Sequence, residues 1–212
     1  MLGSSSRPPF AKPLPDLYIA AVANTTRSSS ITHAGNWHPF EIRTHKPDAI
    51  RSLIAPGGVE DRLRVVAFAE VQARDAFRWG AERFPEAPEA WREEWLRFAD
   101  VEDRHAQMLL DRMDALGLSV AGRAVSDKLT RLCHLAEDPV TFLFLLSSAE
   151  ERGMEAGYTL GQQMKPVDEA SAAVFAQIAS EEVEHVDSAK AALAGQDIEA
   201  LRVKARALSK LI

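Results

Sequence analysis

The chain has 212 residues, a length that suits one domain with a sizeable core and extensions. Its composition, 46% hydrophobic and 26% charged, is ordinary for a soluble globular protein, and the single cysteine, Cys133, excludes an intrachain disulfide. No apolar run approaches the roughly 20 residues of a membrane-spanning helix, and no signal-peptide pattern is present. We therefore expect a cytoplasmic protein without membrane contact.

The net charge of −6 is unevenly distributed along the chain. Residues 1–51 carry +3 and residues 197–212 carry +2, so residues 52–196 carry −11. Because contacts to phosphates need Lys and Arg, this acidic central region argues against general nucleic-acid binding. A basic tail remains a local source of such contacts.

Residues 1–57 are rich in Pro, Ser, Thr and Gly, which predicts an extended arm. Short apolar islands at residues 17–19 and at Trp37 with Phe40 predict that parts of this arm pack on the rest of the chain. We interpret its histidines as surface or packing residues, while the alternative that the arm covers a functional site stays open. These histidines are His33, His38 and His45.

Two long amphipathic helices are predicted next, over about 59–84 and 88–116, and Gly117 ends the second. Glu70 lies inside the apolar stripe of the first helix, and Glu102 and His105 lie inside that of the second. A glutamate on a solvent face is unremarkable, but one in a core stripe needs a partner.

The second half repeats this layout. A crossover helix is predicted over 126–137, a third long helix from Asp138-Pro139 to Pro166, a fourth over about 167–193 and a short helix over 197–211. Glu150 falls in the apolar stripe of the third long helix, and Glu182 and His185 fall in that of the fourth. The pattern predicts an all-α protein.

The charged residues inside the stripes form one constellation that occurs twice. A glutamate is followed after 32 residues by a second glutamate and three residues later by a histidine, and adding 80 to each position gives the second copy. Glu-x-x-His on a helix places both side chains on one face, about one turn apart. The two sets are Glu70, Glu102 and His105, then Glu150, Glu182 and His185.

One lone Glu from each of two helices, plus one Glu-x-x-His from each of two others, is the ligand set of a carboxylate-bridged di-metal site in a four-helix bundle. Four carboxylates and two imidazoles in one core would repel and cost desolvation energy, which two divalent cations offset. Such ligands suit iron, with manganese as the competitor at one or both positions. A metal-free bundle with surface Glu-x-x-His pairs is the weaker alternative, since the spacing recurs within apolar stripes.

Glu151 competes with Glu150 as the ligand from the third long helix. Glu150 continues the apolar stripe and matches the internal repeat, whereas Glu151 is rotated by about 100° around the helix. We therefore predict Glu150.

These motifs, Glu70, Glu102 to His105, Glu150 and Glu182 to His185, resemble the ferritin-like di-iron carboxylate superfamily over about residues 60–193. Within it the chain most resembles an uncharacterised bacterial branch, domain-of-unknown-function family 455, and the neighbouring tRNA-hydroxylase family. The resemblance implies a ferritin-like four-helix bundle over 58–196, an arm over 1–57 and a C-terminal helix over 197–212. It also implies that Glu70 and Glu150 are terminal ligands, that Glu102 and Glu182 bridge the metals, and that His105 and His185 each take one metal.

Three further features bear on these expectations. Val101 precedes Glu102 where many di-iron hydroxylases have Asp, which puts the environment of the histidine in doubt. Arg104 and Arg152 flank the ligands and either pair with carboxylates behind them, such as Glu181, Glu184 or Asp187, or form exposed surface pairs; both alternatives stay open. A glycine row on the third long helix is compatible with a pocket beside Glu150 or with a tight helix contact. The row consists of Gly153, Gly157 and Gly161.

The resemblance implies a non-haem di-iron oxidoreductase, an oxidase or monooxygenase that activates dioxygen. Its organic substrate and electron donor are unidentified, a modified nucleoside is one candidate substrate, and a homodimer is a candidate assembly. The alternative is an iron-binding or peroxide-scavenging protein without an organic substrate. A rubredoxin-type site is excluded, since it needs four cysteines.

Overall fold

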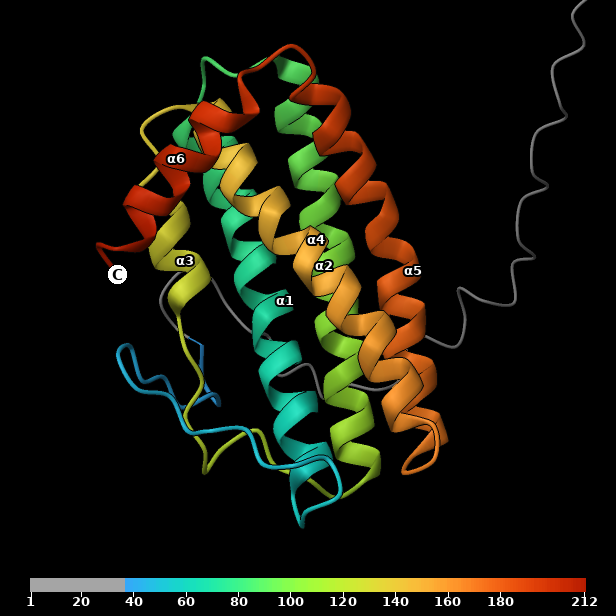
Figure 1. Cartoon of the computed structure of the whole chain (residues 1–212). Helices are drawn as coiled ribbons and strands as arrows, with labels where there is room; N and C mark the ends of the chain where they lie inside the picture. The colour runs from blue at the N-terminus through green and yellow to red at the C-terminus, as the bar shows by residue number, and fades with distance from the viewer. Residues whose placement is uncertain (1–36) are drawn as a thin grey trace, which may run out of the picture. The chain divides into compact units, whose positions relative to one another are not determined.

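The computed structural model describes residues 37–212, and every regular element within them is a helix (Figure 1). The all-α prediction is therefore confirmed for this part of the chain. The apolar island at 17–19 and His33 lie outside the described residues. The helices are α1 (Gly58–Arg83), α2 (Glu89–Ala115), α3 (Lys128–Cys133), α4 (Pro139–Met164), α5 (Glu169–Ala192) and α6 (Ile198–Ser209).

Local chemistry sets the ends of the long helices. Gly57, before α1, has φ +79°, a left-handed conformation that favours glycine. The carboxylates of Asp138 and Asp168 accept hydrogen bonds from the backbone N–H groups of Thr141 and Ser171, which caps α4 and α5. The long helices begin and end within two residues of the predicted positions, because these signals are encoded beside each helix.

The crossover helix is shorter than predicted. We expected 126–137, but α3 ends at Cys133. The backbone N–H of Ala136 then donates to the carbonyl of Cys133 at 3.0 Å, and this turn brings the chain to Asp138. Cys133 is fully buried, and burial raises the pKa of its thiol to about 12, which agrees with a packing role.

The four long helices lie side by side as two hairpins, α1 with α2 and α4 with α5 (Figure 1). Figure 1 also shows that α2 and α4 run in the same direction, so residues 116–138 must return along the length of the helices. An aromatic cluster closes the end of the core near the α1–α2 turn. It includes Phe84, Trp95 and Phe142, each at most 2% exposed.

The described part of the arm packs on α1 and on the crossover. Trp37 donates its indole N–H to Asp75 at 2.9 Å, and both Trp37 and Phe40 contact the ring of Phe68. The backbone of Val125 exchanges hydrogen bonds with residues 41 and 43. The packing predicted from Trp37 and Phe40 is thus present.

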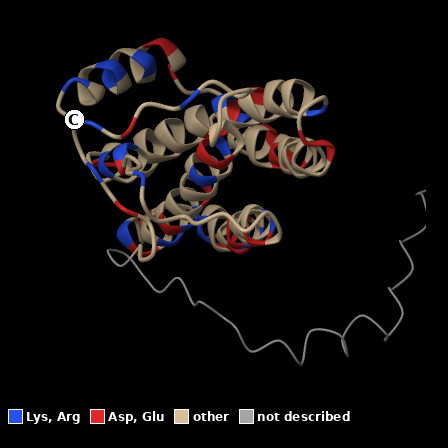
Figure 2. Ribbon diagram, turned by 90° about the horizontal axis from the view of Figure 1, so that it is seen from below, with Lys and Arg blue, Asp and Glu red and all other residues tan. Residues whose placement is uncertain are grey.

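The described histidines of the arm agree with their interpretation as surface residues. His38 and His45 are exposed. Helix α6 has no fully buried residue, and Figure 2 shows its basic residues along the helix nearest the C-terminus. Within the described residues, no helix combines the length and the apolar character needed to cross a membrane.

Candidate metal centre

The four long helices bring all six residues of the constellation to one place in the core. Helix α1 contributes one glutamate, α4 another, and α2 and α5 each contribute a Glu-x-x-His pair. All six side chains are buried, although carboxylates are seldom buried without a partner. Their exposed fractions are 8% for Glu70, 0% for Glu102 and His105, 6% for Glu150, and 3% for Glu182 and His185.

Two of the carboxylates lie between the two imidazoles. Glu102 places one oxygen 2.8 Å from Nδ1 of His185 and the other 3.4 Å from Nδ1 of His105. Glu182 places its oxygens 2.9 Å from Nδ1 of His105 and 2.9 Å from Nδ1 of His185. Each carboxylate therefore faces both histidines, which is the arrangement that a bridging ligand requires.

The six residues divide into two overlapping groups that could each hold a cation. Glu70 and His105 form one group with Glu102 and Glu182, and Glu150 and His185 form the other with the same two glutamates. Within each group the ligand atoms lie within 4.8 Å of one another. The geometry thus offers two adjacent positions that share two carboxylates.

Hydrogen bonding inside the cluster is incomplete. Both side-chain oxygens of Glu102 and of Glu182, and Nδ1 of both histidines, are buried without a hydrogen-bond partner in the described structure. The short contacts between them do not have hydrogen-bond angles. Leaving one buried polar group unpaired costs about 1–3 kcal/mol, so six in one place indicate a missing charged partner. Oxygen and imidazole donors fit a divalent transition metal.

The electrostatics of the cluster show how strongly it needs positive charge. Burial, and then the charges of Glu102 and Glu182, raise the pKa of Glu70 and of Glu150 well above the usual range. Burial lowers the pKa of His105 and His185, but the same carboxylates outweigh it and raise these values to about 10 and about 9. Protons therefore balance the charge of the metal-free cluster at neutral pH.

His105 also forms a hydrogen bond through its second ring nitrogen, on the side away from the cluster. The Nε2–H of His105 donates to Glu181 at 3.0 Å, and Arg104 donates to the same carboxylate at 2.5 Å. This hydrogen bond leaves Nδ1 of His105 facing the carboxylates of Glu102 and Glu182. The predicted pairing of Arg104 with Glu181 is confirmed, whereas Glu184 pairs with Arg97.

The internal repeat shows that the two histidines are supported differently. Position 181 corresponds to position 101 in the first copy, and Val101 cannot accept a hydrogen bond. His105 therefore donates a hydrogen bond to Glu181, a residue of the second copy. The corresponding residue for His185 is Val101, which offers no acceptor. His185 instead packs on the rings of Phe98 and Phe77, with centroids 4.0 and 5.9 Å away.

The structure also separates Glu150 from its neighbour. Glu150 faces the cluster and is 6% exposed. Glu151 points away, with a side chain 47% exposed, and pairs with Lys190 at 3.0 Å. The helical phase predicted for α4 at these two residues is thus the observed one.

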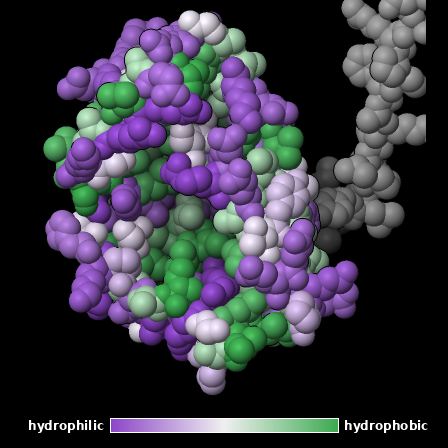
Figure 3. All heavy atoms as spheres, in the orientation of Figure 1, coloured by the Kyte–Doolittle hydropathy of each residue, from purple (hydrophilic) through white to green (hydrophobic). Residues whose placement is uncertain are grey.

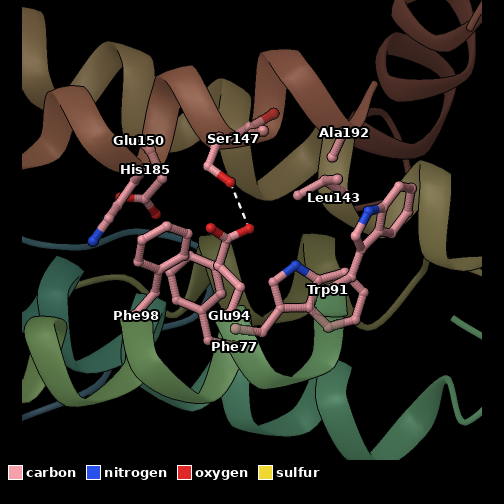
Figure 4. Close-up of a pocket in the computed structure, with 12 residues that line it drawn as sticks. Phe77, Trp91, Glu94, Phe98, Leu143, Ser147, Glu150, His185 and Ala192 are labelled. Carbon is pink, nitrogen blue, oxygen red and sulfur yellow. Dashed lines mark hydrogen bonds between the residues drawn. The ribbon is translucent and has the colours of Figure 1, made fainter. Parts of the chain in front are cut away.

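A small aromatic cavity adjoins the cluster on the side of His185 (Figure 4). Its walls include Phe77, Trp91 and Phe98, and its volume of about 10 Å³ suits a single water-sized molecule. Glu94 enters it and accepts a hydrogen bond from Ser188 at 2.5 Å. Sequence reasoning did not identify Glu94 or Ser188, because a partly exposed glutamate on a charged helix gives no signal.

A larger cleft opens between α1 and α4 on another side of the cluster. This inner cleft has a volume of about 230 Å³ and is lined by Glu70, Glu150 and Glu182 together with apolar residues. Figure 3 shows a hollow with hydrophobic residues on this face of the molecule.

The glycine row on α4 serves both of the predicted purposes. A Cβ at Gly153 would meet no atom within 4 Å, and Gly153 lines the cleft. A Cβ at Gly157 would lie 2.9 Å from Cβ of Ala179, and one at Gly161 would lie 3.4 Å from Cβ of Ala176. The row is therefore open beside the cluster and tightly packed against α5 farther along.

Comparison with known proteins places the chain in a family but assigns no activity. Neither the curated proteins nor the solved structures gave a match. One family model, described as a protein of unknown function (DUF455), matches residues 25–194, which include all six residues of the cluster. The match also agrees with the sequence resemblance to this family. The chain therefore belongs to the DUF455 family.

Proposed function

We propose that this protein is a non-haem di-iron oxidoreductase of the ferritin-like superfamily, an oxidase or hydroxylase of an organic substrate. The observation that carries the proposal is the pair of buried carboxylates, Glu102 and Glu182, each facing both histidines with unpaired oxygens. The parallel course of α2 and α4, joined by a long crossover, supports the ferritin-like bundle.

The six residues would hold the metals as follows. Glu70 and His105 would bind one ion, Glu150 and His185 the other, and Glu102 and Glu182 both. Four carboxylate charges offset the four positive charges of two divalent cations, which removes the cost of burying either set alone. Iron is the proposed occupant, and manganese fits the same donors.

Bound iron would supply dioxygen reduction, and a hydroxylase places one oxygen atom in a C–H bond and reduces the other to water with two electrons and two protons from outside. The chain supplies the surroundings. Glu181 orients the ring of His105 through Nε2. Phe77 and Phe98 pack against the ring of His185 and restrict the space on that side to the small aromatic cavity.

The inner cleft favours an enzyme over an iron-binding or peroxide-scavenging protein. It leads to three of the four carboxylates through an apolar passage far larger than peroxide needs. A protein that reacts only with peroxide has no use for such a passage, whereas an organic substrate requires one. The electron donor is a separate, unidentified partner.

Metal analysis tests the first part of this proposal. Purified protein loaded anaerobically with ferrous iron should contain two ions per chain and should melt at a higher temperature than the metal-free protein. The double variant Glu102→Ala/Glu182→Ala should bind none, and Glu184→Ala, an exposed control, should bind both. A folded protein with no metal would refute the metal centre.

Oxygen chemistry tests the second part. On exposure to dioxygen, loaded protein supplied with a chemical reductant and cell extract should consume oxygen beyond the amount needed to oxidise its own iron. Consumption that stops at this amount, together with rapid turnover of peroxide, would support the scavenging alternative instead.

A further inference from the structure

The inner cleft continues to the surface of the protein. A second hollow, the outer cleft, has a volume of about 620 Å³ and shares Val65, Val66 and Ala156 with the inner one. The two clefts therefore adjoin each other between α1 and α4, and the hollow in Figure 3 lies on this face. A molecule of extended shape can therefore reach from solvent to the carboxylate cluster.

The inner cleft offers no hydrogen-bonding side chain except the carboxylates of the cluster. Every other lining residue is apolar, with Val66, Leu129 and Ile178 among them. A purine or pyrimidine base would lose its hydrogen bonds to water here and would find no replacement, which is costly. An alkyl chain would lose nothing and would gain by leaving water. The lining therefore selects an alkyl group over a nucleobase.

The outer cleft has a different chemistry. Two arginines, Arg62 and Arg152, and one acid, Glu155, line it beside apolar residues. Arg62 is held in place, because its guanidinium donates to the carbonyls of Arg51 and Gly58. Arg152 is exposed and forms no ion pair with another residue in 37–212. The rim thus has an excess of positive charge and one guanidinium available for a ligand.

We propose that this passage binds an alkyl carboxylate, with the alkyl chain in the inner cleft and the carboxylate at Arg152. This inference rests on the proposed function, since it names the class of substrate that the same centre would oxidise. It replaces the nucleoside that the sequence resemblance suggested with an aliphatic acid. The end of the chain far from the carboxylate would then lie beside Glu70 and Glu150.

Calorimetric titration of the full chain, both metal-free and manganese-loaded, tests the binding mode. The probes are octanoate, decanoate, decan-1-ol, decyltrimethylammonium and adenosine monophosphate, used below micelle-forming concentrations. Decanoate should bind about fifteenfold more tightly than octanoate, because it has two more methylenes and each buried methylene adds roughly fourfold. Decanol should bind more weakly than decanoate, and the cation and the nucleotide should show no binding.

Two variants test the positions. Arg152→Gln should weaken decanoate binding several-fold and leave decanol unchanged, while Arg206→Gln, an exposed control on α6, should change neither. Ala156→Leu, at the junction of the two clefts, should weaken both probes without changing metal content. Ala173→Leu, on the exposed side of α5, is its control.

The outcomes separate this inference from the proposed function. Equal binding of decanoate and decanol, no effect of Arg152→Gln, preference for the nucleotide, or decanoate binding only to loaded protein would each overturn the alkyl-carboxylate mode. The last result would mean that the carboxylate reaches the metal. Metal content is measured independently. Protein that binds two metal ions but no decanoate would refute this inference alone. Protein that binds decanoate but takes up no metal on loading would refute only the di-iron proposal.

Discussion

At the scale of single residues, the candidate centre depends on which side of a helix each charged group occupies. Glu150 and Glu151 are neighbours in the chain, yet one is buried in the cluster and the other pairs with Lys190 in solvent. Burial raises the pKa of Glu150 well above the usual range, whereas the side chain of Glu151 is 47% exposed. The two glutamates therefore differ in burial and in partners because they lie on different sides of α4.

The pair allows a matched test of the ligand assignment. Glu150→Ala should lose one of two metal ions, or retain both with slower reaction of reduced iron with dioxygen. Glu151→Ala should match the wild-type protein in both respects, because it removes only an exposed ion pair worth at most about 1 kcal/mol. Metal content per chain and stopped-flow oxidation measure the difference. The reverse pattern would show that the helical phase of α4 is wrong.

At the scale of elements, the contact between α4 and α5 is set by small residues. Gly157 lies against Ala179, and only the missing Cβ allows the two helices to approach so closely. Gly153, one turn earlier, has no neighbour and borders the inner cleft. Both glycines border the inner cleft, but one turn of α4 separates a position with room for a Cβ from one that α5 fills.

Alanine at these two glycines should have opposite effects on stability. Gly153→Ala should raise the melting temperature, because alanine is favoured over glycine in a helix by about 1 kcal/mol and nothing obstructs its Cβ. Gly157→Ala should lower it, because a Cβ 2.9 Å from that of Ala179 forces the helices apart at a cost of roughly 1–3 kcal/mol. Thermal melts of both variants measure the two shifts. Equal shifts of the melting temperature in the same direction would contradict the difference in packing between the two glycines.

At the scale of the whole described molecule, Asp61 joins three segments distant in sequence. It lies in the first turn of α1, accepts hydrogen bonds from Arg51 of the arm at 2.6 and 2.8 Å, and pairs with Arg123 of the crossover at 3.0 Å. Burial raises its pKa, but Arg51 and Arg123 outweigh burial and lower the pKa to about 2. The arm and the crossover are thus held on α1 by one carboxylate.

Asp61 should make stability depend on pH in acid. Its pKa lies below the ordinary value of 3.8, so its contribution is fully present above about pH 4 and is lost as the pH falls through about 2. Asp61→Asn should lower the free energy of unfolding by roughly 2 kcal/mol at neutral pH, and the difference from wild type should shrink toward pH 2. Urea unfolding of metal-free protein measures it, with Asp100→Asn, 82% exposed, as control. A difference independent of pH would refute this role.

The sequence by itself determined the helices and the six residues of the candidate centre. Helical period and capping are local, so Asp138 and Asp168 mark the starts of α4 and α5 within a few residues of chain. The 80-residue repeat and the position of each glutamate within an apolar stripe are likewise visible without a structure. Prediction was weaker where a segment has no such period, and α3 is accordingly shorter than expected.

Only the tertiary structure decided what surrounds the six residues. The contact between His105 and Glu181 joins positions 76 residues apart, and the bond between Glu94 and Ser188 joins positions 94 apart. Such pairs depend on how far apart two helices lie and how each is rotated, which no pattern within one helix specifies. The same holds for Gly153 and Gly157: both line the inner cleft, but only at Gly157 does α5 come so close that an added Cβ would meet Ala179.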